Sequence, residues 1–214
     1  FDGNFKISPI KKPTRALVMV SKFDHCLIEL FNKVKNKNLN LIIPAVISNH
    51  NDLKEITLIE NIQFHHFPVN ANKLEQEKKV FDFVNNNNIE LIILARYMQI
   101  LSKEFVNKFY GKIINIHHSF LPSFKGAKPY HQAYERGVKI IGATAHFVNQ
   151  NLDEGPIIEQ DIEKVDHELG PKDLVSIGKD IESRVLYKAI KNFSEGRIFL
   201  NGQKTVVFKG DKLL

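Results

Sequence analysis

The sequence predicts an α/β protein in which helices cover both faces of a mixed, mostly parallel, Rossmann-like sheet. Short aliphatic segments alternate along most of the 214 residues with segments whose apolar positions recur every three or four residues. Several of the short segments are aliphatic at nearly every position, which is typical of parallel strands buried on both faces. Hydrophobic residues make up 43% of the chain, enough for the core of one sizeable domain.

Seven segments have the length and composition of strands. They are residues 15–20, 39–48, 63–69, 89–95, 112–118, 139–148 and 156–165. Between the first four of them, apolar residues follow helical spacing. The predicted helices there are residues 23–35, 51–61 and 73–84. Because strands and helices alternate, most neighbouring strands are expected to be parallel.

The last fifty residues predict one long helix followed by a hairpin. Pro171 suits the first turn of a helix over residues 172–194, because its fixed φ is already helical. Apolar residues form one stripe along this helix: Leu174, Ile177, Ile181, Val185, Ala189 and Phe193. Asn201-Gly202 then separates two strand-like segments, which is a strong hairpin signal.

Composition and charge exclude several classes of protein. The net charge is +6, but the five arginines are scattered and no basic stripe is interleaved with aromatics, so we expect no nucleic-acid partner. No segment reaches the ~20 apolar residues of a membrane span, and the first residues lack the apolar core of a secretory leader. The single cysteine, Cys26, lies in a helical segment and is expected to be a buried apolar residue. It fits a reducing, cytoplasmic location.

The segment NIHHSFLPSFKG, residues 115–126, places two histidines at the end of a predicted strand. Successive side chains of a strand point to opposite faces, so Asn115 and His117 share one face while His118 lies with the aliphatic residues of the other. Ligands bind beyond the carboxyl ends of parallel strands. His117 is therefore the functional candidate, and His118 is expected to be a packed structural histidine.

Asparagine and histidine on one strand edge suit carbonyl chemistry. The amide of Asn115 can donate to a carbonyl oxygen on which negative charge develops, and His117 can supply or remove a proton near neutral pH. A carboxylate is missing from this pair. Asp153, in the polar loop between the last two predicted strands, is the candidate, although an Asp in a Gly/Pro-rich loop is usually a turn residue.

Two longer motifs resemble a known family: NIHHSFLPSFKGAKPYHQAYERG and GATAHFVNQNLDEGPII. Together they resemble the formyltransferase-fold family that acts on 10-formyltetrahydrofolate, and the double histidine, PYHQAYERG and NLDEGPI are most similar to its formyltetrahydrofolate deformylases. The resemblance runs from about Arg15 to Phe208. It implies a formyltransferase-type fold and hydrolysis of 10-formyltetrahydrofolate to tetrahydrofolate and formate. That reaction supplies formate for purine biosynthesis and balances the one-carbon folate pools.

The resemblance also implies the site. Asn115, His117 and Asp153 correspond to the catalytic residues, the strand-end loop RYMQIL to the pterin-binding loop, and residues 148–153 to the folate loop, with His146 nearby. The implied substrate-binding residues are Arg96, Tyr97, Met98, Gln99, Ile100, Leu101, His146, Val148, Asn149, Gln150 and Asn151. Which of His117, Asp153 and water gives up or takes each proton stays open. No metal and no cofactor are implied, since the folate is the substrate and water the acceptor.

The same resemblance bears on organisation. Deformylases of this kind usually carry an N-terminal ACT-type regulatory domain, so residues 1–14 are expected to be a remnant of that domain or its linker, and residues 15–214 the catalytic domain. A homo-oligomer is expected. The sharp return of the loop between Ser119 and Gly126 suggests a cis Leu121-Pro122 peptide bond, and the resemblance raises this expectation above the usual rate for such bonds without deciding it.

Three alternatives remain open. The first is formyl transfer to an amine such as glycinamide ribonucleotide. It is disfavoured because no glycine occurs between Arg15 and Lys108, where a phosphate-binding loop needs glycines, and because Phe23 and Asp24 are bulky and acidic there. The second is a metal site, disfavoured because adjacent histidines on a strand diverge and no ligand-like spacing occurs. The third is a nucleotide- or RNA-binding module without enzymatic activity.

Overall fold

The computed structural model describes residues 12–69, 73–122 and 129–210. Within them the strands are β1 (Thr14–Val20), β2 (Leu41–Ile42), β3 (Ala45–Ser48), β4 (Gln63–His66), β5 (Leu91–Leu94), β6 (Ile113–His117), β7 (Ile140–Phe147), β8 (Ile157–Lys164), β9 (Ile198–Asn201) and β10 (Lys204–Val207). The helices are α1 (His25–Lys35), α2 (Lys54–Ile59), α3 (Lys73–Asn86), α4 (Lys103–Lys108), α5 (Pro129–Glu135) and α6 (Pro171–Ser194). Most of the predicted remnant, residues 1–11, lies outside the described residues, and the domain division stays a prediction.

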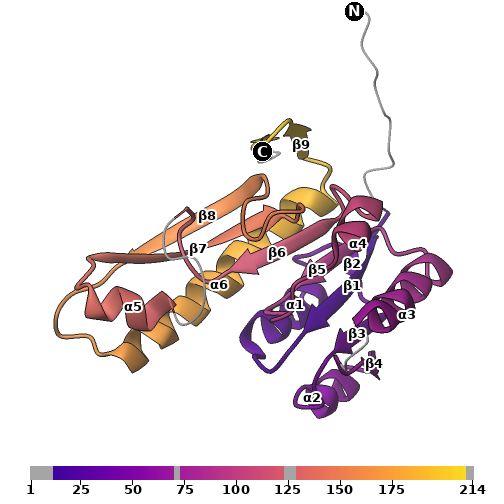
Figure 1. Cartoon of the computed structure of the whole chain (residues 1–214), viewed down its shortest axis with the longest axis horizontal. Coiled ribbons are helices and arrows are strands. Elements are labelled where there is room, and N and C mark those ends of the chain that lie inside the picture. Colours follow the sequence, from indigo (N-terminus) through magenta and orange to yellow (C-terminus); the bar gives the residue numbers. More distant parts are fainter. Residues whose placement is uncertain (1–11, 70–72, 123–128, 211–214) are drawn as a thin grey trace, which may run out of the picture.

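One mixed sheet organises the chain (Figure 1). Its strand order is β4-β3-β1-β5-β6-β7-β8, and β2 pairs with the beginning of β1. Pairs from β4 to β6 are parallel, whereas β7 is antiparallel to both β6 and β8. The prediction of a mixed, mostly parallel sheet is therefore confirmed. Chain order reverses between β1 and β5, which is where open α/β sheets bind ligands.

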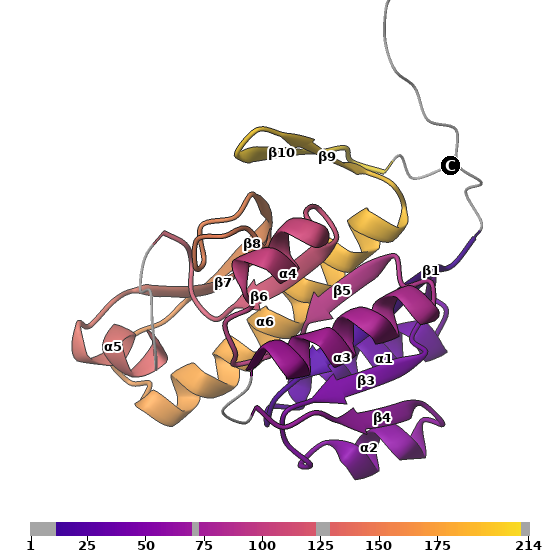
Figure 2. The same cartoon turned by 45° about the vertical axis from the view of Figure 1, so that its right-hand side comes forward.

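Two helical layers cover the sheet (Figure 2). One apolar core joins one face to residues of α1 and α6, and a second joins the other face to residues of α3 and α4. All four residues of β5 are buried: Leu91 and Ile93 belong to the first core, and Ile92 and Leu94 to the second. A strand that contributes to both cores must be apolar at every position, which is the pattern that predicted it.

All seven predicted strands are present, and one of them is divided into two. Residues 39–48 form β2 and β3, because Pro44 between them has no backbone N–H with which to continue the ladder to β1. Two short helices, α4 and α5, were not predicted. Each spans fewer than two full turns, so neither has enough apolar positions to show helical periodicity.

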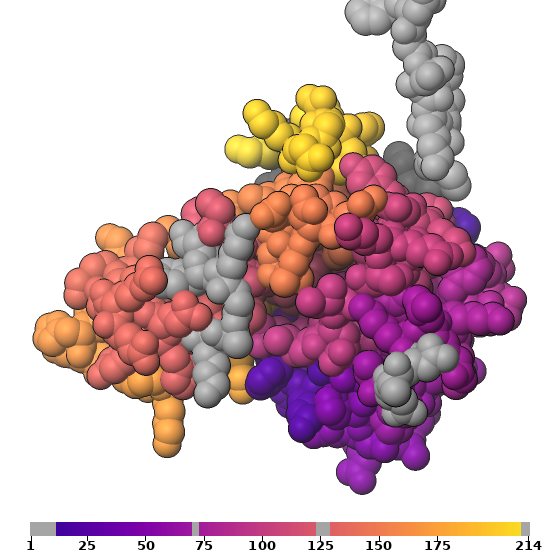
Figure 3. Space-filling model, in the orientation of Figure 1, coloured from indigo at the N-terminus to yellow at the C-terminus, as the bar shows by residue number. Residues whose placement is uncertain are grey.

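The C-terminal prediction is confirmed. The helix α6 begins at Pro171 and lies along β6, β7 and β8 with its apolar stripe against the sheet. The strands β9 and β10 then form the expected hairpin, with Gly202 at a positive φ of 59° in its turn, and this hairpin projects from the body of the molecule (Figure 3). Among the described helices, none is long and apolar enough to cross a membrane.

Candidate functional site

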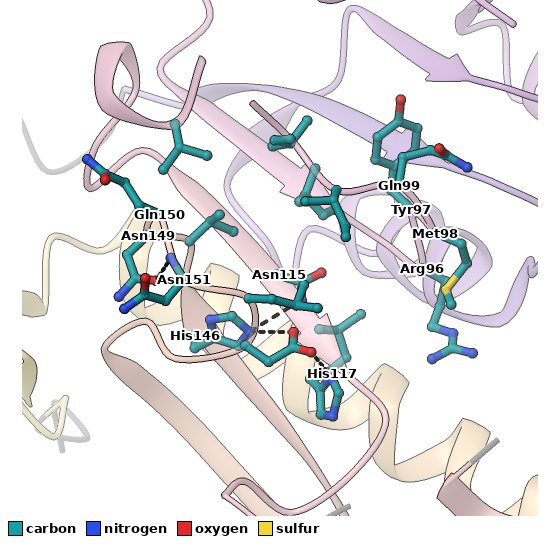
Figure 4. A pocket seen from close by; sticks show the side chains of 18 of the residues that line it. Arg96, Tyr97, Met98, Gln99, Asn115, His117, His146, Asn149, Gln150 and Asn151 are labelled. Atoms are coloured by element: carbon teal, nitrogen blue, oxygen red, sulfur yellow. Dashed lines mark hydrogen bonds and ion pairs between the residues drawn. The ribbon is translucent and has the colours of Figure 1, made fainter. Parts of the chain in front are cut away.

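A pocket of about 250 Å³ lies at the carboxyl ends of β5 and β6, beneath the loop that joins β7 to β8. Every residue predicted for the site lines it: Arg96, Tyr97, Met98, Gln99, Ile100, Leu101, Asn115, His117, His146, Val148, Asn149, Gln150, Asn151 and Asp153. Figure 4 shows Asn149, Gln150 and Asn151 at one end of the pocket and Arg96 at the other, with Asn115 and His117 between them. Three separate segments therefore build the site that the sequence predicted.

The strand β6 presents Asn115 and His117 to the pocket. Ile114 and Ile116 belong to the core that contains α6, whereas Ile113 belongs to the opposite core. The alternation of side chains predicted for this strand is thus confirmed. His146 of β7 pairs directly across from Asn115, so its ring joins the same cluster.

The loop after β7 brings Asp153 onto this cluster. Asp153 has a left-handed backbone with φ of 56°, a conformation that Asp tolerates better than most residues. Two residues later, Gly155 lies so close to the chain that a Cβ atom would be 1.7 Å from the Phe147 carbonyl oxygen. Phe147 N in turn donates to Pro156 O at 2.9 Å. The Asp-x-Gly-Pro sequence therefore folds the loop back tightly and aims the carboxylate at β6.

Four side chains are in contact within the pocket, and Figure 4 shows how three of them converge. His117 Nδ1 lies 3.2 Å from Asp153 Oδ2, and His146 Nε2 lies 3.7 Å from Asp153 Oδ1. Asn115 Nδ2 is 3.3 Å from His146 Nε2, while His146 Nδ1 donates to the Phe147 carbonyl oxygen at 2.8 Å. The predicted proximity of Asp153 to Asn115 and His117 is confirmed. We call these four residues the His117 cluster.

The electrostatics of the His117 cluster favour an ionised Asp153. Burial alone would raise the pKa of this carboxyl, but the neighbouring imidazoles of His117 and His146 outweigh burial and hold the pKa below its usual range. His117 is buried, and its Nε2 has no hydrogen-bond partner among the described residues. An unpaired buried nitrogen costs free energy, so it is expected to gain a partner when a ligand binds.

His118 has a different environment. Its ring lies at the edge of Tyr130, with the two centroids 6.3 Å apart, and burial followed by the charge of Arg96 lowers its pKa to about 3. It is therefore a packed, neutral histidine, as predicted. It nonetheless also lines the pocket, together with Leu94, Val106 and Ile116, none of which was predicted for the site, and with Leu152 of the predicted folate loop.

The loop after β5 is held by residues that sequence analysis missed. Met98 N donates to Ser21 Oγ at 2.9 Å, and Gln76 Nε2 lies 2.9 Å from the hydroxyl of Tyr97. Ser102 N donates to Glu77 Oε1 at 2.7 Å. These partners come from β1, α3 and their flanks, so no local pattern could have identified them. Tyr97 points its hydroxyl into this framework, which leaves its ring as a fixed wall of the pocket.

The Leu121-Pro122 bond is cis, which was one of the two outcomes that the sequence left open. The segment before it is fixed by Thr144 of β7. This hydroxyl donates to Ser119 O at 2.9 Å and accepts from Leu121 N at 3.0 Å. The rest of the predicted loop, through Gly126, lies outside the described residues.

Comparison with known proteins identifies the family. Residues 14–190 match the sequence model of a protein family that is described as formyl transferase. The chain belongs to the formyl transferase family. Among its relatives is a formyltetrahydrofolate deformylase of Corynebacterium sp. (strain P-1), 48% identical over 210 residues, a match that covers 98% of this chain and 73% of the relative. A relative of the same name from Bacillus subtilis (strain 168) is 47% identical over 97% of this chain and 70% of its own length.

Solved structures agree with this assignment. A formyltetrahydrofolate deformylase from Burkholderia mallei superimposes with a TM-score of 0.91 at 49% identity, covering 94% of this chain and 72% of that one. A glycinamide ribonucleotide transformylase from Symbiobacterium toebii has a TM-score of 0.87 at only 27% identity, and the match covers 92% of this chain and 95% of that one. The formyltransferase fold is thus shared with transferases, while the sequence is closer to the deformylases, and the resemblance noted in the sequence is confirmed.

Proposed function

We propose that this chain hydrolyses 10-formyltetrahydrofolate to tetrahydrofolate and formate. The observation that carries the proposal is the His117 cluster, in which an amide, an imidazole with an unpartnered nitrogen and an ionised carboxylate meet at one end of a pocket. The similarity to formyltetrahydrofolate deformylases at 47–48% identity supports the choice of substrate.

We assign the roles as follows, with support from the geometry. Asn115 Nδ2 donates to the formyl oxygen, and the unpartnered Nε2 of His117, when protonated, donates to the same oxygen as it becomes an oxyanion. Asp153 Oδ2 stabilises the positive charge of that imidazolium from the Nδ1 side. Its second oxygen, Oδ1, lies toward His146 and accepts a hydrogen bond from the attacking water.

The reaction balances with water alone. The water oxygen bonds to the formyl carbon, the carbon–nitrogen bond breaks, and the leaving nitrogen gains the proton that the water loses through Asp153. The product is formic acid, which ionises to formate. No metal and no further cofactor is required by this scheme. The only group of potential metal ligands within the described residues, His25, Cys26 and Glu182, lies outside the His117 cluster.

Two loops would hold the folate. We assign the pterin to the segment from Arg96 to Leu101, whose backbone is fixed by its contacts with Ser21 and Glu77. We assign the rest of the bound portion to the loop from Val148 to Asn151. This loop is stabilised by Gln150 Nε2, which donates to Asn107 Oδ1 at 2.7 Å. We further propose that the chain acts in the cytoplasm, consistent with the buried thiol of Cys26, and as a homo-oligomer.

The test is an assay for formate with 10-formyltetrahydrofolate and no amine acceptor. We expect formate release that is unchanged when glycinamide ribonucleotide is added, because Phe23 and Asp24 follow β1 in place of a glycine-rich phosphate loop. Stoichiometric formylation of glycinamide ribonucleotide at a rate above that of hydrolysis would contradict the proposal and favour a transferase. Absence of any turnover of the folate by folded protein would also contradict it.

A further inference from the structure

Arg96 lies in an unusual position for an arginine. It comes two residues after the end of β5, and its φ of 62° is in the left-handed region that non-glycine residues rarely occupy. Only 8% of the residue is exposed, yet it lines the pocket. Strained backbone that persists at a pocket is a reason to look for a function.

A second polar cluster holds the guanidinium in place. Glu182 of α6 is 1% exposed and has three cationic or hydroxyl neighbours. Arg96 Nε lies 3.3 Å and His25 Nε2 2.8 Å from its Oε2, and the hydroxyl of Tyr130 donates to Oε1 at 2.7 Å. The ring of Phe23 covers the guanidinium, with 4.9 Å between the guanidinium carbon and the ring centroid. We call His25, Arg96, Tyr130 and Glu182 the Glu182 cluster.

This arrangement occupies only one edge of the guanidinium. In the described part of the chain, Arg96 makes no hydrogen bond, and its contact with Glu182 is an ion pair through Nε. Its two terminal NH₂ groups are not among the fully buried polar atoms that lack a partner, and the residue lines the pocket. Figure 4 shows the end of the Arg96 side chain at the side of the pocket opposite Asn149 to Asn151, beyond His117.

Two simpler explanations fit less well. A purely structural arginine would be expected to use its terminal nitrogens in hydrogen bonds to the protein, since buried donors are normally paired. A metal site at His25, Cys26 and Glu182 is opposed by the occupied carboxylate and by Cys26, because burial raises the pKa of this thiol well above its usual value and a thiol binds metal as the thiolate. What remains is a cation that Glu182 and Phe23 hold at the pocket, with terminal NH₂ groups that make no hydrogen bond to the described residues.

We propose that Arg96 is the subsite for the product formate, which its two terminal NH₂ groups bind through both carboxylate oxygens. The inference rests on the proposed function, in which the formyl carbon leaves the folate as a carboxylate beside His117. A planar guanidinium fork matches a carboxylate in geometry and charge. Glu182 and Phe23 would act as positioning residues, since they fix the guanidinium without contacting the anion.

The experiment is a titration of the full chain with ¹³C-formate, followed by the formate NMR signal, without any folate. We expect saturable binding by the wild type, weakened roughly tenfold or more in Arg96→Gln, because charged hydrogen bonds to one carboxylate are lost. Arg96→Lys retains the charge but loses the fork, and should bind with intermediate affinity. Arg184→Gln is the matched control, since Arg184 pairs with Asp161 and Glu163 outside the pocket, and it should bind formate as the wild type does.

The design separates an effect on binding from an effect on folding. Arg96→Gln leaves the charge of Glu182 buried, so the double variant Arg96→Gln/Glu182→Gln, which removes both charges, is measured beside it. Equal formate binding by the wild type and a folded double variant would overturn the inference, as would no saturable binding by the wild type. Because the titration needs no turnover, its result is independent of the assay that tests hydrolysis.

Discussion

Two polar clusters flank β6, and they differ in what the central group of each cluster contacts. In the Glu182 cluster the buried carboxylate has a neighbour at each oxygen, supplied by three separate segments of the chain. In the His117 cluster, the strand face opposite α6 carries an imidazole whose Nε2 has no partner in the described residues. A buried carboxylate that is paired at both oxygens stabilises a fold, whereas an unpartnered imidazole nitrogen at a pocket leaves capacity for a substrate. The comparison predicts that the two clusters respond to mutation through different observables.

The largest expected effect is on activity, from the His117 cluster. Asn115→Ala, His117→Ala and Asp153→Ala should each lower kcat by about 10²- to 10⁴-fold, because each removes an oxyanion donor or a proton-handling group. Formate release measured under single-turnover conditions checks this, with thermal unfolding to verify that each variant is folded.

His118→Gln is the matched control for these variants. Its ring lies against Tyr130 rather than Asp153, so a clearly smaller loss of activity is expected. Equal losses in folded His117→Ala and His118→Gln would show that the alternation of side chains along β6 does not separate the roles of the two histidines.

The next effect is on stability, from the Glu182 cluster. Glu182→Ala should lower the free energy of unfolding by about 3–5 kcal/mol, because it leaves the buried cation of Arg96 without its partner. Glu182→Gln should cost less, since the amide oxygen can still accept from one of the two neighbours, His25 or Tyr130. Urea denaturation measures both. By comparison, Asp153→Asn should change the free energy of unfolding little. If it lowered this free energy as much as Glu182→Ala does, the two clusters would not differ in their contribution to stability.

The effect expected to be smallest near neutral pH is a pH dependence of stability from His118, which lies between the clusters. Its pKa is about 3 in the folded chain and about 6.5 when exposed, so the unfolded state binds the extra proton between these values. Stability should therefore fall as pH decreases from about 6.5 toward 3, by roughly 1.4 kcal/mol per pH unit for this one group. Folding lowers the pKa of the Asp153 and Glu182 carboxyls. Their contributions to the stability of the folded chain are therefore lost only when these carboxyls protonate, below about pH 4.

Chemical denaturation at several pH values measures this dependence. We expect the slope between pH 6.5 and 4.5 to become shallower in His118→Gln, because glutamine does not titrate. An unchanged slope in that variant would mean that another group carries the dependence.

Much of the fold could be predicted from the sequence because strands and helices follow short-range rules, and the candidate catalytic residues were predicted from strand alternation together with the family resemblance. Strand β5 is apolar throughout since it is buried on two faces, and strand alternation alone separated His117 from His118. Asp153 was chosen as the carboxylate missing from the pair of Asn115 and His117 and through the family resemblance of its loop. The structure shows why this loop contains Gly155: it can close on Phe147 only if residue 155 has no Cβ.

Only the tertiary structure determined how distant residues combine. Arg96 and Glu182 are single charged residues in unrelated segments, and nothing local indicates that α6 brings the carboxylate against the end of β5. Likewise, Ser21 and Gln76 give no sequence signal for holding the pocket loop. Periodicity reports which face of an element is buried, because burial repeats with the element's own geometry. It carries no information on which side chains from other elements meet there, since that depends on how the packed layers position each element.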